Sequence, residues 1–240
     1  MILRRRFIAL CLVSLMLPIL ALSEVTVSFR EVDIYFPQEA DWTYHYFCRY
    51  PVLENKNPSA ESINHYYETA VSEMTQLVLP MYANDPDMAA YGQNGFVQQY
   101  EITCSNDKFF STRMLQTQTL GDSVFETVHS QVFAVNGPYA GESLTLRGLL
   151  GEIGESSAQI AQAVLHDTWQ RIQKETAADD SPWLKDLTFE AFAFDFYPEE
   201  HFYADKDGNA VFYLQPGLFR ADLEIILFTY SIQDILTLIS

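Results

Sequence analysis

The 240-residue sequence has few basic residues, few cysteines and none of the short motifs that mark common enzyme classes. Lysine and arginine together number 14 against 32 acidic residues, which gives a formal net charge of −18 at pH 7. Such an excess of negative charge repels the phosphate backbone of nucleic acids, so no nucleic acid is expected as a partner. High solubility and the capture of a cationic protein or peptide are both consistent with this charge.

The motifs of several catalytic classes are missing. The sequence has no G-x-S-x-G nucleophile turn, no H-E-x-x-H zinc pair, no glycine-rich phosphate loop and no C-x-x-C pair. A metal site needs several ligands that converge, and the five histidines are isolated from one another in the sequence. They are His45, His65, His129, His166 and His201. We assign no catalytic residue, no metal ligand and no cofactor.

No apolar run long enough to cross a bilayer lies beyond residue 23. The most apolar stretch there, residues 223–239, is interrupted by Glu224, Gln233 and Asp234. A membrane helix needs about 20 largely apolar residues, so no transmembrane helix is expected after residue 23.

Residues 1–23 have the pattern of a secretory signal peptide. Three consecutive arginines precede an apolar run at residues 7–22, and cleavage is expected between Ser23 and Glu24. A retained membrane anchor is the alternative, although the apolar run is short and contains Pro18. We expect an extracytoplasmic protein, either secreted or associated with the cell envelope. Cleavage would remove three arginines and no acid, leaving 11 basic against 32 acidic side chains and a formal charge of −21.

Two cysteines remain beyond residue 23, Cys48 and Cys104. Each falls on the aromatic face of an alternating segment, residues 44–50 and residues 100–104, so these segments are expected to be neighbouring strands. In an oxidising compartment a disulfide between them is predicted. Two buried free thiols are the alternative, because the sequence does not fix the distance between their Cα atoms.

Hydrophobic periodicity predicts two main helices. The first is expected to be capped by Ser59 or Ser62 and to end before Pro80, and the second is expected at residues 155–174 behind Ser156 and Ser157. A change of parity near Arg30 and Glu31 predicts a bulge or a kink in the first strand. Strands are expected at residues 25–36, 42–53, 96–104, 108–119, 123–135, 187–194, 201–204, 210–214 and 223–230.

This order of elements favours an α+β fold, with largely antiparallel sheet and two main helices packed against it. The short linkers after residues 104 and 119 predict an antiparallel meander of three strands. We treat residues 24–240 as a single module, with an N-terminal part at about residues 24–138 and a C-terminal part at about residues 139–240.

The best candidates for acid–base chemistry are Glu199, Glu200 and His201, together with Asp195. We interpret them as a charged turn before a strand, because neighbouring residues of a strand point to opposite faces. Residues 205–209 are interpreted as a hairpin turn, since they lack the alternating aspartates and the distal glutamate of a calcium loop.

Landmarks along the chain resemble a known family. A turn with Gly208, a strand that leads to Pro216 and a later strand that ends at Tyr230 look like the C-terminal half of the RsiV-type domain of unknown function. Three further landmarks lie upstream, at Tyr50 and Pro51, at Asn64, and at residues 144–146, and the similarity covers about residues 43–235. The family-like positions are Tyr50, Pro51, Asn64, Leu144, Leu146, Phe202, Gly208, Phe212, Tyr213, Pro216 and Tyr230. Residues 216–222 depart from the family, which usually has a tyrosine after the proline.

The resemblance implies an extracytoplasmic bacterial module. Such modules occur as the outer part of anti-sigma factors that sense lysozyme, and beside peptidoglycan deacetylase domains. Because neither attachment is found in this sequence, signal transduction and deacetylation are not expected of it.

We therefore expect an exported, non-catalytic binding or sensor-like module that recognises a cationic protein such as lysozyme, or a cell-wall component such as peptidoglycan. Two alternatives stay open: a carboxylate-dependent hydrolase acting on envelope polymers, and a structural envelope protein. The aromatic residues Phe202, Tyr203, Phe212 and Tyr213 are expected to pack in a sheet core.

Overall fold

The computed structural model describes residues 25–36, 42–151, 155–176, 181–220 and 222–240. The expected signal peptide, with its cleavage site at Ser23 and Glu24, lies outside the described residues. The fold is α+β with two sheets, as expected. No helix in the described ranges is long and apolar enough to cross a bilayer.

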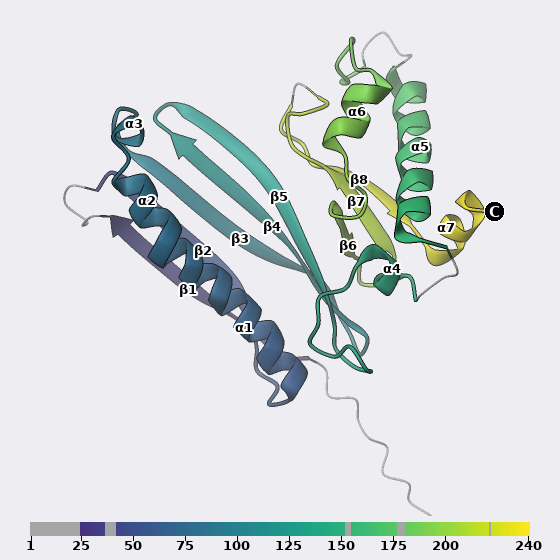
Figure 1. The fold of residues 1–240 in the computed structure, drawn as a ribbon, viewed down its shortest axis with the longest axis horizontal. Coiled ribbons are helices and arrows are strands. Elements are labelled where there is room, and N and C mark those ends of the chain that lie inside the picture. Colours follow the sequence, from purple (N-terminus) through teal and green to yellow (C-terminus); the bar gives the residue numbers. More distant parts are fainter. Residues whose placement is uncertain (1–24, 37–41, 152–154, 177–180, 221) are drawn as a thin grey trace, which may run out of the picture.

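Five strands form the first sheet, in the order β1-β2-β3-β4-β5 (Figure 1). The expected meander of the last three strands is confirmed, since β3, β4 and β5 pair antiparallel. The sheet is mixed, however, because β2 and β3 are parallel and are joined by a long helical crossover. The strands are β1 (Val27–Phe36), β2 (Tyr44–Leu53), β3 (Asn94–Ser105), β4 (Phe109–Leu120) and β5 (Ser123–Ala134).

The second sheet is smaller and antiparallel, with β7 in the middle. Its strands are β6 (Phe202–Ala204), β7 (Ala210–Leu214) and β8 (Ile226–Tyr230). The link between β6 and β7 is the expected hairpin turn. Asp205 accepts hydrogen bonds from the backbone N–H groups of Asp207 and Asn209, each at 2.9 Å, and Gly208 adopts a φ of 80° that favours glycine.

The first long helix is α1 (Pro58–Glu73), which continues through a π-helical turn (Met74–Val78) into α2 (Leu79–Ala83). Asn57 caps it, rather than Ser59 or Ser62, because its side chain accepts a hydrogen bond from the Ala60 N–H at 2.8 Å. The expected end before Pro80 is wrong. The π-helical turn changes the hydrogen-bond pattern where proline has no N–H to donate, so the helical course continues to Ala83.

The second long helix is confirmed as α5 (Ser157–Thr176). Ser156 and Gln159 cap it reciprocally: the Ser156 hydroxyl accepts from the Gln159 N–H, and the Gln159 side chain accepts from the Ser156 N–H. Four shorter helices complete the described chain, and they are α3 (Pro86–Ala89), α4 (Leu146–Leu149), α6 (Phe189–Asp195) and α7 (Ile232–Leu238).

Helix α6 replaces the strand expected at residues 187–194. Thr188 caps it by accepting a hydrogen bond from the Ala191 N–H. Phe192 and Phe196 are spaced four residues apart, so both turn inward and are buried, and Phe192 packs on Trp169 of α5. The aromatic residues therefore follow a helical period rather than the alternation of a strand.

Helix α1 covers one face of the first sheet, at β2 and the adjoining ends of β4 and β5 (Figure 1). Tyr44, Tyr46 and Cys48 of β2 are buried on this face. Asn64 fastens the helix to β2 because its side-chain amide both donates to and accepts from the backbone of Leu53, at 2.9 and 2.8 Å.

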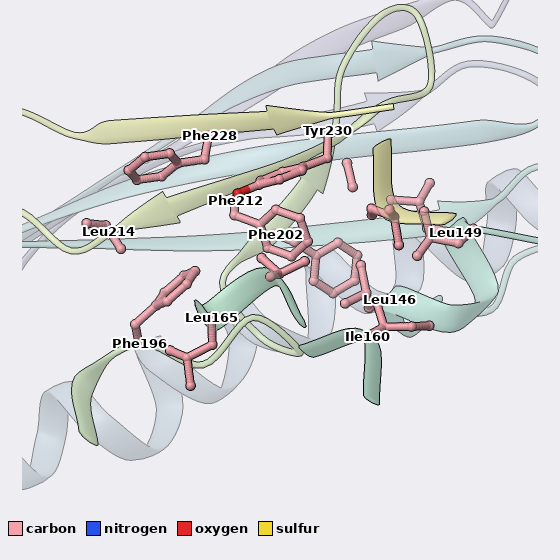
Figure 2. Packing of buried hydrophobic residues seen from close by; sticks show 14 of the residues in the cluster. Leu146, Leu149, Ile160, Leu165, Phe196, Phe202, Phe212, Leu214, Phe228 and Tyr230 are labelled. Atoms are coloured by element: carbon pink, nitrogen blue, oxygen red, sulfur yellow. The ribbon is translucent and has the colours of Figure 1, made fainter. Parts of the chain in front are cut away.

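The second sheet lies between the first sheet and helix α5. Every residue of β7 is buried, and alternate side chains point to different layers. Val211 and Tyr213 pack with Val128 of β5, whereas Phe212 and Leu214 join the cluster that includes Leu165 of α5 (Figure 2). The expectation that the aromatic residues of β6 and β7 build a core is confirmed.

Polar contacts from Ser111, Ser130 and Gln215 join the two sheets. The buried Ser111 hydroxyl of β4 accepts a hydrogen bond from the Ala204 N–H at 3.1 Å. The Ser130 hydroxyl of β5 donates to the carbonyl of Phe202. The side-chain amide of Gln215 pairs twice with the backbone of Val128, at 2.8 Å each, and so satisfies polar groups along the edge strand β5.

Of the bulge or kink expected near Arg30 and Glu31, the bulge is not found. Strand β1 pairs with β2 without interruption from Val27 to Phe36. The Arg49 guanidinium covers the ring of Phe29 at 3.9 Å, whereas Val27 and Val32 both pack against the core cluster that includes Ile63 of α1.

The predicted disulfide between Cys48 and Cys104 is also wrong, and both residues are buried free thiols. Cys48 lies opposite Gln98 of the parallel strand β3. Cys104 is six positions farther along β3, which at about 3.3 Å per residue places it roughly 20 Å away. That separation far exceeds the Cα distance that a disulfide can bridge.

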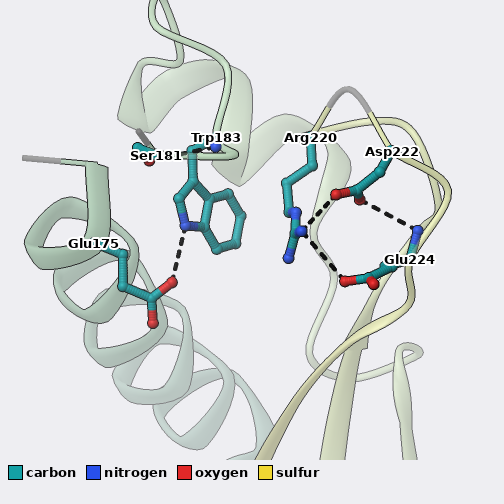
Figure 3. Close-up of polar contacts among 6 residues, drawn as sticks. All are labelled: Glu175, Ser181, Trp183, Arg220, Asp222 and Glu224. Atoms are coloured by element: carbon teal, nitrogen blue, oxygen red, sulfur yellow. Dashed lines mark hydrogen bonds and ion pairs between the residues drawn. The ribbon is translucent and has the colours of Figure 1, made fainter. Parts of the chain in front are cut away.

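The described residues of the divergent linker, 216–220 and 222, make contacts of their own. Phe219 is buried against Phe192, with ring centroids 5.2 Å apart. Arg220 reaches the carboxylates of both Asp222 and Glu224, as Figure 3 shows. In the same view the indole N–H of Trp183 donates to Glu175 at 2.9 Å, which ties the segment before α6 to the end of α5.

The two thiols are expected to be unreactive in the folded protein. Burial raises the pKa of both, in the case of Cys104 to about 11, so little reactive thiolate is present. We expect alkylation of the protein without residues 1–23 to be slow under native conditions, and two thiols to react at once in denaturant without any reductant. Detection of no free thiol in denaturant would contradict the structure.

The Gln215 contact predicts a measurable loss of stability. Gln215→Met should lower the free energy of unfolding by about 1–3 kcal/mol, because the N–H and C=O groups of Val128 lose their partners. Gln233→Met, on the exposed side of α7, is the matched control and should change it by less than about 0.5 kcal/mol. Urea denaturation of the two variants checks this, and equal stabilities would refute the role given to Gln215.

Candidate functional site

Three adjoining hollows form a groove where the two sheets meet. They have volumes of about 280, 310 and 240 Å³. The first two share Ser143, Leu144 and Thr145, and the last two share Glu199 and Glu200, so neighbouring hollows adjoin. We call this feature the junction groove.

One wall of the junction groove is the segment between β5 and α4. Its backbone pairs with the end of β5, since the Leu144 N–H donates to the carbonyl of Val132 at 2.8 Å and the Ala134 N–H donates to that of Glu142 at 3.1 Å. Gly141 adopts a φ of 87°, and a Cβ there would lie 2.8 Å from the Cβ of Ser62 in α1. The segment therefore lies close against α1 and has little freedom to shift.

The opposite wall is the turn between α6 and β6. The His201 N–H donates to the carbonyl of Tyr197 at 2.8 Å, and the Tyr197 N–H donates to Nδ1 of His201 at 3.3 Å. The His201 ring packs against the rings of Phe196 and Tyr213. These contacts fix the turn and present Glu199 and Glu200, both exposed, to the junction groove.

The four acid–base candidates do not converge on one site. Glu199 and Glu200 line the junction groove, while Asp195 ends α6 and does not line it. His201 is a structural part of the turn, with Nδ1 accepting from the backbone. The interpretation of residues 199–201 as a turn before a strand is confirmed.

The charge of the junction groove is mainly negative. Glu142, Glu199 and Glu200 line it together with a single cation, Arg147. Among the described residues, none of these three glutamates forms an ion pair with a lysine or arginine. The aromatic rings of Tyr139 and Tyr197, exposed by 52% and 48%, lie in the two outer hollows.

The histidines do not gather into a metal site within the described ranges. His45 contacts the Asp33 carboxylate at 2.7 Å and stacks on Tyr35, and His166 stacks on Phe189. The carboxylates and imidazoles of the described chain thus provide no converging ligand set for a metal ion.

Most of the family-like residues pack in the core or hold elements of the fold together, and few of them line the junction groove. Tyr50, Pro51, Phe212, Tyr213, Pro216 and Tyr230 are buried, Asn64 fastens α1, and Gly208 forms a turn. The Tyr230 hydroxyl donates to Asp167 of α5 at 2.8 Å. Only Leu144 and Phe202 of the set line the junction groove, whereas Leu146 is buried at the start of α4.

Sequence reasoning missed several lining residues, among them Tyr139, Glu142, Ser130 and Gln131. No local pattern distinguishes them, because the groove arises from the pairing of residues 142–144 with β5. The one available signal was the density of acidic residues around position 200.

The half-buried His201 predicts a dependence of stability on pH. Burial, and to a smaller degree His129, lowers the pKa of its imidazole below the ordinary value of 6.5, although Glu200 opposes the shift. The unfolded chain therefore takes up the proton more readily than the folded protein. This contribution to stability is complete above pH 6.5 and is lost as the pH falls toward the folded-state pKa.

His201→Asn should flatten this dependence, because asparagine keeps an acceptor for the Tyr197 N–H and does not titrate. We expect the free energy of unfolding of the variant to fall less than that of the unchanged protein between about pH 7 and about pH 5.5. Urea denaturation over this range measures it, and identical slopes would show that His201 makes no such contribution.

No model of a protein family matches the sequence, and no curated protein matches it either. Among solved structures, a DUF3298 family member from Bacteroides fragilis is similar, with a TM-score of 0.51 and 14% sequence identity, and the match covers 89% of this chain and 99% of that one. A DUF3298 family protein from Pseudomonas aeruginosa aligns with a TM-score of 0.47 and 10% identity, over 88% and 92% of the two chains. The chain is therefore similar in fold, over most of its length, to a bacterial DUF3298 protein.

Proposed function

We propose that this protein is a non-catalytic recognition module whose junction groove binds a cationic protein. The observation that carries the proposal is the set of exposed glutamates in the groove, Glu142, Glu199 and Glu200, which have no lysine or arginine partner in the described chain. Lysine or arginine side chains of a partner would supply the missing counter-charges.

The surroundings of the glutamates favour a protein partner. Exposed tyrosines are enriched at protein interfaces, since they offer a large apolar area together with a hydroxyl group, and Tyr139 and Tyr197 lie in the outer hollows of the groove. The walls are held by backbone hydrogen bonds, so little ordering is required on binding.

The net charge of the chain supports the same conclusion. At −18 for all 240 residues, the protein attracts cationic proteins over long distances and speeds their encounter, an effect that salt weakens. The proposal includes export, which rests on the signal-like residues 1–23, and a relation to the RsiV-type modules, which rests on the sequence landmarks. Lysozyme is the first partner to test, because it is cationic and the resemblance points to it.

The test is a calorimetric titration of the protein without residues 1–23 with lysozyme, at low and at moderate salt. We expect saturable binding that salt weakens. The triple variant Glu142→Gln, Glu199→Gln, Glu200→Gln should bind about tenfold more weakly, because each exposed ion pair contributes roughly 0.2–1 kcal/mol.

The control makes the same change in charge elsewhere. Glu73→Gln, Asp122→Asn and Glu126→Gln together remove three negative charges on other surfaces, and should weaken binding by less than about twofold at moderate salt. Equal losses in both triple variants would show that only the overall charge matters, and no binding by the unchanged protein would remove lysozyme as the partner.

A further inference from the structure

Another hollow, of about 280 Å³, lies across β5 from the junction groove. It is on the face of the first sheet that α1 only partly covers. Three glutamines from three successive strands line it: Gln98 of β3, Gln116 of β4 and Gln131 of β5. Tyr66 and Ala70 of α1 form its helical side, and His129 of β5 also lines it. We call it the amide hollow.

The register of the sheet brings these side chains together. Gln98 of β3 pairs directly with Gln116 of β4. Two other residues of β4 pair with β5: Thr112 with Gln131, and Met114 with His129. Thr112, Met114 and Gln116 are alternate residues of one strand, so they lie on the same face. Directly paired residues project from the same face of a sheet, so the glutamines and the histidine share one surface. Beyond the part of this face that α1 covers, they form the floor of the hollow.

Hydrogen bonds hold the glutamine amides in fixed orientations. The buried Tyr46 donates its hydroxyl hydrogen to Oε1 of Gln98 at 2.8 Å, and Nε2 of Gln98 donates to Oε1 of Gln116, also at 2.8 Å. In this chain Oε1 of Gln116 contacts Gln98, and Nε2 is its other amide end. Within the described chain that nitrogen donates to no residue, so both of its N–H groups are available to a ligand.

The helical side of the hollow is equally well held. The Tyr66 hydroxyl donates to Oε1 of Gln131 at 3.2 Å, and its ring meets those of Tyr67 and Phe133 edge to face. The ring of Tyr66 remains 43% exposed, so it offers a rigid aromatic surface beside the amides.

The amide hollow is also uncharged. No aspartate, glutamate, lysine or arginine lines it, although the chain as a whole carries a charge of −18. Desolvation by neighbouring atoms lowers the pKa of His129, although its side chain is exposed, and this favours the neutral imidazole at neutral pH. A charged ligand would lose its hydration here without gaining a counter-charge.

We propose that the amide hollow binds one unit of an uncharged oligosaccharide. Sugar hydroxyl groups both donate and accept hydrogen bonds, and they match amides and a neutral imidazole that offer both functions. The apolar face of a sugar ring can lie on the exposed ring of Tyr66. The volume of about 280 Å³ lies just below the range of ligand sites, about 300–1,000 Å³, which suits a single unit of a longer chain.

This site is separate from the function proposed above. The glutamates of the junction groove take no part in the amide hollow, although Ser130 and Gln131 line both. Loss of cationic protein binding in the triple glutamate variant should therefore leave oligosaccharide binding unchanged.

The test is an NMR titration of the protein without residues 1–23 with three neutral trisaccharides, namely those of N-acetylglucosamine, of β-1,4-linked glucose and of α-1,4-linked glucose. We expect at least one to bind saturably and to shift the side-chain amide signals of Gln98 and Gln116. The trisaccharide of N-acetylglucosamine is the leading probe, because its acetamido carbonyl is an acceptor for the free Gln116 amide.

Two variants and a control locate the binding. Gln116→Met should weaken it about threefold to tenfold, the loss expected for a hydrogen bond between neutral groups. Ala70→Tyr should abolish it by filling the hollow from α1, while Gln99→Met, on the opposite face of β3, should leave it unchanged.

Two results would overturn the proposal. One is the absence of saturable binding by all three trisaccharides. The other is binding that Ala70→Tyr leaves intact in a variant whose NMR spectrum shows a folded protein, since the ligand would then bind elsewhere. Because Gln116→Met places an apolar side chain at a half-buried position, it keeps the test decisive even if Ala70→Tyr fails to fold.

Discussion

Strand β7 lies between two layers, with Val211 and Tyr213 against the first sheet and Phe212 and Leu214 against helix α5. A three-stranded sheet with strands of three to five residues is too small to be stable by itself. It gains stability only because both of its faces are covered, at about 1.5–3 kcal/mol for each large side chain that is fully buried. The C-terminal elements therefore depend on the first sheet for their position.

The same packing creates the junction groove. Backbone groups at the sheet boundary need partners, and Ser111, Ser130 and Gln215 provide them. These contacts bring the turn that carries Glu199 and Glu200 to the segment that carries Glu142. The groove is thus a product of how the sheets meet, and its charge comes from residues more than 50 positions apart in the sequence.

Much of the fold could be predicted because the signals are local. The two long helices, the β3–β5 meander and the turn at residues 205–209 follow from periodicity and turn residues. Residues 187–194 could not be assigned correctly, because Phe189, Phe192 and Phe194 fit a strand on one face or the other, and only Thr188 and the spacing to Phe196 reveal the helix. The disulfide was predicted wrongly for a related reason, since alternation places Cys48 and Cys104 on strands but does not give their register.

The two proposed binding sites could not be predicted from the sequence for the same physical reason. Gln98, Gln116 and Gln131 are unremarkable polar residues in the sequence, and they become neighbours only through the pairing of β3, β4 and β5. The glutamines lie in an uncharged hollow and Glu199 and Glu200 in an acidic groove, although β5 alone separates the amide hollow from the junction groove. Ser130 and Gln131 line both, and the Gln131 amide bonds to Tyr66 on one side and to Ser143 on the other. A ligand that moved Gln131 in the amide hollow would therefore act on the Ser143 wall of the junction groove through a single side chain.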